Sequence, residues 1–210
     1  LFTADLHIRT FKVLQLEGDL RQALAQKEFS LHYQPIVSLT TGQLSGFEAL
    51  VRWQHPQRGF IPPCEFIPIS EDTGFIIPLG EWVLREACRQ LHTWHQAFPE
   101  QAKLIVSVNL SSKQLRDPGL IDCIDRILSE TELDGQFLKL ELTESMLVDD
   151  IERVLQTLNS LRARNIQLSI DDFGTGYSSL SYLPRFPINT LKIDRSFVSR
   201  MISDAENLEI

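Results

Sequence analysis

The sequence predicts an α/β protein, a TIM-like βα barrel that begins with a β-hairpin and is truncated before its last two βα units. After residue 100, short apolar runs alternate with helical stretches, as in parallel βα units joined by right-handed crossovers. Apolar and polar side chains alternate within each run, so every strand has a polar face. Such a face fits a barrel lumen better than a doubly wound sheet. Residues 29–210 are fewer than the ~250 of a closed βα barrel, hence the expected truncation.

Residues 1–28 are predicted to form a lead-in helix that arrives from an upstream domain. Between Asp5 and Gln26, apolar residues recur mostly three or four positions apart, which is the spacing of an amphipathic helix. The first residue is Leu rather than Met, so we expect the chain to be a fragment of a longer protein.

The domain itself, residues 29–210, is expected to begin with a hairpin. Two β-rich runs, Phe29–Leu39 and Gln43–Trp53, are separated by a short gap that contains Gly42. The helices expected next cover residues 62–71 and 74–98. Further strands are expected at 104–110, 137–142, 166–171 and 188–194, with helices at 118–131 and 150–165.

Composition and charge exclude several classes of function. A formal net charge of −8 argues against binding to DNA or RNA, and against contact of this segment with an anionic membrane. Three cysteines without a C-x-x-C pair favour a reduced, cytoplasmic compartment. The sequence has no apolar run of about 18 residues, so no membrane span is expected here, although the protein could be anchored elsewhere.

The polar faces of the predicted strands carry oxygen ligands or charge. These residues are Glu48, Asn109, Glu141, Asp171, Asp172 and Lys192. The C-terminal ends of barrel strands form one rim, so the groups would converge on a single cleft. Crowded carboxylates need a counter-charge, and hard oxygen ligands suit Mg²⁺, Mn²⁺ or Ca²⁺. Each residue alone is equally compatible with a solvated strand end or a helix cap, so the pattern leaves both interpretations open.

Six motifs occur in one order between residues 33 and 194. They are Tyr33-Gln34-Pro35-Ile36, Glu48-Ala49-Leu50-Val51-Arg52, Val108-Asn109-Leu110-Ser111, Glu141-Leu142-Thr143-Glu144-Ser145, the ten residues from Asp171 to Leu180, and Leu191-Lys192-Ile193-Asp194. Together they resemble the EAL domain family, and the stretch that begins at Asp171 is highly specific. The resemblance implies hydrolysis of cyclic di-GMP to linear pGpG by a two-metal mechanism.

The resemblance also implies residue roles at the metal site. The metal ligands would be Glu48, Asn109, Glu141, Asp171 and Asp172, holding two Mg²⁺ or Mn²⁺ ions. We expect Ca²⁺ to fit these ligands yet inhibit, because its coordination shell is larger and looser. Lys192 would contact the attacking water, and two nearby cations would depress its pKa.

Substrate contacts and a loop anchor follow from the same resemblance. Arg52 would hold a phosphate, Gln34 a guanine, and Asp194 would be a further substrate contact. Alternatives are a rim salt bridge for Arg52 and a buried glutamine at a strand edge for Gln34. Glu144 would anchor the loop Phe173–Leu180, which follows the aspartate pair.

The alternative function is a non-catalytic cyclic di-GMP receptor or signalling module, which a real truncation would favour. Residues 16–24 resemble the segment that joins a GGDEF domain to an EAL domain, so we expect an upstream GGDEF or sensory domain. The family's next strand, with a further acidic residue, would lie beyond Ile210. If the chain ended there, exposed strand edges would favour a homodimer.

Overall fold

The computed structural model describes residues 14–101, 103–147, 150–174 and 183–203, with side chains through Ser199. Its centre is one sheet in the order β1-β2-β4-β5-β6-β7, with β3 paired to β2. The strands are β1 (Phe29–Val37), β2 (Leu44–His55), β3 (Gly59–Ile61), β4 (Ile105–Asn109), β5 (Leu138–Thr143), β6 (Gln167–Phe173) and β7 (Thr190–Ile193).

Strands β1 and β2 form the predicted antiparallel hairpin, and β2, β4, β5, β6 and β7 run parallel, as predicted. Gly46 lies where β2 meets the parallel strands. A Cβ atom there would lie 2.4 Å from the backbone oxygen of Ile105, so glycine allows β2 and β4 to approach. Strand β3 was not predicted, because three residues are too few to show a period.

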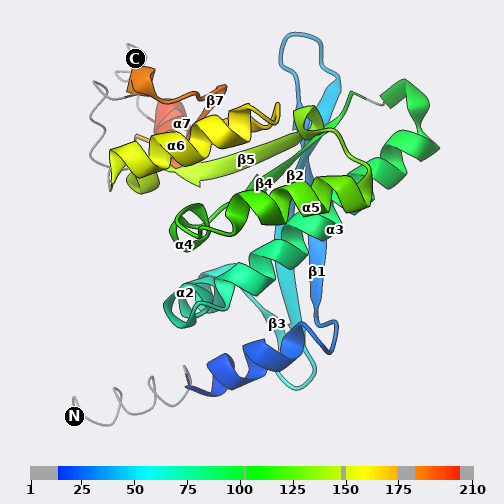
Figure 1. Ribbon diagram of the computed structural model, residues 1–210, viewed down its shortest axis with the longest axis vertical. Coiled ribbons are helices and arrows are strands. Elements are labelled where there is room, and N and C mark those ends of the chain that lie inside the picture. The colour runs from blue at the N-terminus through cyan, green and yellow to red at the C-terminus, as the bar shows by residue number, and fades with distance from the viewer. Residues whose placement is uncertain (1–13, 102, 148–149, 175–182, 204–210) are drawn as a thin grey trace.

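The four predicted helices are present: α2 (Pro63–Thr73), α3 (Ile76–Ala97), α5 (Leu120–Thr131) and α6 (Ile151–Arg162). The last three cover one face of the sheet (Figure 1). Figure 1 shows α3, α5 and α6 side by side over the sheet. The short helices that the sequence analysis did not predict are α4 (Ser112–Leu115), α7 (Arg195–Ser203) and the 3₁₀ turns Pro99–Gln101, Gly135–Phe137, Glu144–Leu147 and Leu183–Arg185. None of the described helices is both long and apolar enough to cross a bilayer.

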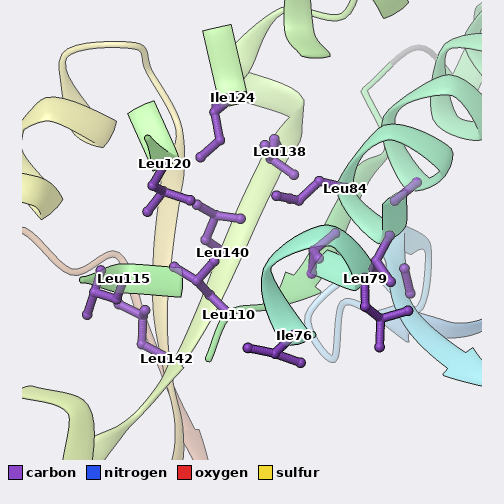
Figure 2. Close-up of a cluster of buried hydrophobic side chains, with 14 of the residues drawn as sticks. Ile76, Leu79, Leu84, Leu110, Leu115, Leu120, Ile124, Leu138, Leu140 and Leu142 are labelled. Atoms are coloured by element: carbon purple, nitrogen blue, oxygen red, sulfur yellow. The ribbon is translucent and has the colours of Figure 1, made fainter. Parts of the chain in front are cut away.

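The apolar strand faces form the core under these helices, as the alternation predicted. Leu138, Leu140 and Leu142 of β5 are at most 1% exposed, and Figure 2 shows them among side chains of α3 and α5. The prediction is wrong for β7. There Leu191 is 42% and Ile193 is 66% exposed, because no helix among the described residues covers that part of the sheet.

Residues 14–23 are helical, in agreement with the predicted lead-in helix, of which residues 1–13 lie outside the described part. Leu20 and Ala23 are fully buried in the core of the domain. Asp19 Oδ2 lies 3.3 Å from Nε2 of His55, which is the last residue of β2. The helix therefore packs as part of this domain. Its origin in an upstream domain stays a prediction.

Candidate active site at the carboxyl ends of the strands

The candidate residues come from neighbouring strands and lie at similar positions along the strand direction. Asn109 of β4 is aligned with Glu141 of β5, and Asp171 of β6 is aligned with the residue two positions after Glu141. Glu48 of β2 and Lys192 of β7 belong to strands on either side of these three. The parallel order thus brings together groups that are up to 144 positions apart in the sequence.

Lys192 joins three carboxylates. Its Nζ donates to Glu48 Oε2 at 3.1 Å, to Asp171 Oδ2 at 3.0 Å and to Glu141 Oε2. Each acid offers an oxygen, and these oxygens lie within 4.8 Å of one another. Asn109 extends the network, because its Nδ2 donates to Glu48 Oε1 at 2.9 Å.

Burial and the charges of neighbouring side chains both shift the pKa values of Glu141 and Lys192. Burial raises the pKa of Glu141, and the charges of Glu48 and Asp171 raise it further, while Lys192 opposes both. Burial alone would lower the pKa of Lys192, but its hydrogen bonds to Glu141 and Asp171 and the charge of Glu48 hold that pKa above its usual value. The carboxylates therefore keep Lys192 protonated. The expected fall of this pKa depends on bound cations and stays a prediction.

Asp171 and Asp172 lie at an irregularity of β6. The register with β7 shifts between Ile170 and Phe173, and Asp172 has a φ of 52°. Aspartate tolerates this left-handed conformation better than most residues, and such irregularities re-aim side chains beside active sites. Burial raises the pKa of Asp172, and the negative charges of Asp171 and Asp194 raise it further. The Asp172 carboxylate therefore interacts electrostatically with the neighbouring acids.

The loop after Asn109 is held by a capping box that the sequence analysis missed. Ser111 accepts a hydrogen bond from the backbone of Gln114 at 3.3 Å, and the Gln114 side chain accepts one from the backbone of Ser111 at 3.1 Å. The spacing of these two residues was a signal that could have found it. Gly80 of α3 makes room, because a Cβ atom there would lie 1.9 Å from Gln114 Nε2.

A cavity of about 340 Å³ opens beside the cluster. Arg52, Asn109 and Glu141 line it together with residues of α2 and α3. The Arg52 guanidinium donates to the backbone oxygen of Val51 at 2.9 Å. A larger cavity, about 440 Å³, lies between α3 and α5 and contains none of the predicted site residues, so the smaller one is the better candidate for substrate.

The other predicted residues lie around this centre. Gln34 of β1 is exposed and pairs with Glu48, so it is not the buried glutamine of the alternative interpretation. Asp194 accepts a hydrogen bond from the backbone of Ser196 at 2.9 Å at the start of α7. The buried Glu144 accepts one from the backbone of Gly174 at 3.1 Å, just after the aspartate pair. The rest of the predicted loop, 175–180, lies outside the described residues.

Known proteins are similar to this chain over nearly its whole length. The EAL domain profile matches residues 17–210. MucR of Pseudomonas aeruginosa, a bifunctional diguanylate cyclase/cyclic di-GMP phosphodiesterase, is 44% identical over 209 residues, 100% of this chain and 30% of MucR. The cyclic di-GMP phosphodiesterase PdeR of Escherichia coli is 40% identical over 198 residues, 94% of this chain and 29% of PdeR.

Solved structures are similar over the same region. The phosphodiesterase of PaMucR in complex with c-di-GMP has a TM-score of 0.86 and 46% identity, covering 92% of this chain and 77% of that one. EAL domains are TIM-like barrels, and the described strands form an open part of such a barrel, in which β1 and β7 are the ends. The chain spans about a quarter to a third of the length of the curated relatives it matches.

Proposed function

This chain belongs to the EAL domain family, and we propose that it hydrolyses cyclic di-GMP to linear pGpG by a two-metal mechanism. The observation that carries the proposal is the convergence of Glu48, Glu141, Asp171 and Lys192 from four parallel strands. MucR and PdeR, named as cyclic di-GMP phosphodiesterases, support the same substrate.

The donor set fits divalent cations. Carboxylate oxygens within 4.8 Å of one another are hard ligands, which Mg²⁺ and Mn²⁺ prefer. In the proposal Glu48, Asn109, Glu141, Asp171 and Asp172 hold two such ions. When bound, the ions would supply the positive charge that activates a water and neutralises the phosphate.

The side chains around the ions have separate tasks in this proposal. Lys192 holds the attacking water by a hydrogen bond from Nζ. Arg52 binds a phosphate oxygen through its guanidinium. Gln34 and Asp194 contact the nucleotide, and Glu144 anchors the loop after the aspartate pair through Gly174. The water oxygen bonds to phosphorus, one P–O bond of the ring breaks, and the departing ribose oxygen takes up a proton in place of the one that the water loses, which opens the cyclic dinucleotide to pGpG.

The test is conversion of cyclic di-GMP to pGpG by the purified protein, followed by chromatography. We expect turnover with Mg²⁺ or Mn²⁺ and little with Ca²⁺, because Ca²⁺ has a larger, looser shell. Binding of cyclic di-GMP without turnover would contradict the proposed hydrolysis and favour a non-catalytic cyclic di-GMP receptor. Full activity with Ca²⁺ alone would contradict the proposed two-ion geometry.

Arg52→Ala is expected to raise KM about tenfold or more with a smaller change in kcat. Arg52 lines the cavity beside the cluster but makes no ion pair among the described residues, so its charge is available to a phosphate. Steady-state kinetics measures both constants. The control is Arg89→Ala, which removes an exposed arginine paired with Glu86 on α3. An unchanged KM in Arg52→Ala would remove this residue from the substrate site.

The wider assembly is also a proposal. We propose a homodimer, an upstream regulatory domain in the same polypeptide, and a cytoplasmic location. The name of MucR, which includes a diguanylate cyclase activity beside the phosphodiesterase, supports the second of these. Light scattering on the whole protein measures the first, and a monomer at working concentrations would contradict it.

A further inference from the structure

We infer that the Lys192 ammonium and a divalent cation compete for the same place between Glu48, Glu141 and Asp171. On this inference Lys192 is an internal counter-ion that the cation displaces. It deepens the proposed function, because it concerns the cation that this function requires.

The contacts of Lys192 are those expected of a cation in the site. Its Nζ lies within hydrogen-bond distance of one oxygen of each of the three acids. Those oxygens are themselves close enough to share one ion. Glu141 is almost fully buried, so an unpaired negative charge there would be costly, and Lys192 supplies the compensation.

A count of donors gives the second argument. An ammonium group has three N–H bonds, and here each has a carboxylate to which it donates. None remains for the water that Lys192 contacts in the proposed mechanism. Lys192 must therefore release at least one carboxylate before it can hold that water, and a cation that binds these oxygens brings about this release.

The charge balance permits the exchange. Three carboxylates outnumber one ammonium, so the cluster with Lys192 in place still attracts a divalent ion. The ion and the ammonium repel each other at these separations, so they do not occupy the centre together. Lys192 thus changes from counter-ion to water contact when the cation binds.

Lys192→Met tests this directly, since methionine keeps much of the side-chain length and removes the charge. The dissociation constant for Mn²⁺, measured by calorimetry on EDTA-treated protein, is expected to fall about tenfold or more. The thermal midpoint in EDTA is expected to fall as well, and Mn²⁺ should raise it more than in the wild type. Lys192→Arg, which keeps the positive charge, should not show the tighter binding.

Lys139→Met is the matched control. Lys139 lies on β5 two residues before Glu141, whose charge acts to raise the pKa of Lys139. Among the described residues, no hydrogen bond joins Lys139 to the three acids. Its loss should change the Mn²⁺ dissociation constant less than about threefold. Circular dichroism confirms that each variant is folded. An Mn²⁺ affinity in folded Lys192→Met that is unchanged or weaker overturns the inference, as does the absence of binding in every variant.

Crystal structures of the wild type with and without Mn²⁺ test the inference without any variant. With the ion bound, Nζ should no longer contact all three acids, and persistence of all three contacts overturns the inference. Hydrolysis is measured separately on the wild type. Tighter Mn²⁺ binding by Lys192→Met in a protein that does not hydrolyse cyclic di-GMP would support the inference and reject the proposed function.

Discussion

Asp171→Asn is expected to lower kcat for cyclic di-GMP hydrolysis by about 10²–10³-fold or more. Asp171 supplies one of the three clustered carboxylates, and its Oδ2 lies 3.0 Å from Lys192 Nζ. Asparagine has nearly the same shape but lacks the charge that attracts a cation. Initial rates of pGpG formation at saturating substrate and Mg²⁺ measure the effect.

The control for this variant is Asp125→Asn on α5. It makes the same chemical change at an exposed aspartate that pairs with Arg164, away from the cluster. We expect near-normal hydrolysis there, with a loss of stability of at most about 1 kcal/mol. Near-normal turnover by Asp171→Asn would show that the cluster is not the site of chemistry.

Trp53→Ala is expected to lower the free energy of unfolding by about 3–5 kcal/mol. Trp53 of β2 is fully buried, and its ring packs on Phe29 and Phe66. Its Nε1 donates to Glu28 Oε2 at 2.8 Å, which links the end of the lead-in segment to the sheet. Alanine would leave a cavity and an unpaired acceptor, and urea denaturation followed by circular dichroism measures the loss.

Trp53→Phe separates the two contributions. It keeps most of the ring packing and removes the hydrogen bond, so we expect a smaller loss of about 1–3 kcal/mol. Phe98→Ala is the surface control, because Phe98 is 59% exposed and should change stability by about 0.5 kcal/mol or less. A loss below about 1 kcal/mol in Trp53→Ala would mean that this part of the chain contributes little to the domain.

The polar residues at the strand ends could be predicted because the alternation of apolar and polar residues involves only neighbours in the sequence. Val106, Val108 and Leu110 alternate with Ser107 and Asn109, and this alternation alone predicts one covered face and one polar face. Parallel βα order then requires Asn109 and Glu141 to lie on one rim, and the structure aligns them. The same pattern failed at Leu191 and Ile193, because alternation states which side chains share a face but not what covers that face.

The geometry around Asp172 was not predictable from alternation. Strict alternation sends Asp171 and Asp172 to opposite faces, yet the register shift in β6 and the positive φ of Asp172 alter that rule. The capping box at Ser111 was visible as a spacing, but its link to Gly80 depends on how α3 packs.

By itself the sequence determined the order of the longer strands and helices, the family through its motifs, and the residue types of the polar rim. These features depend on neighbours a few positions apart, where periodicity and turn chemistry act. Only the tertiary structure decided that Lys192 reaches Glu48, Glu141 and Asp171 at once. That contact joins strands β2, β5, β6 and β7, and it follows from register and twist across the whole sheet, which no local pattern specifies.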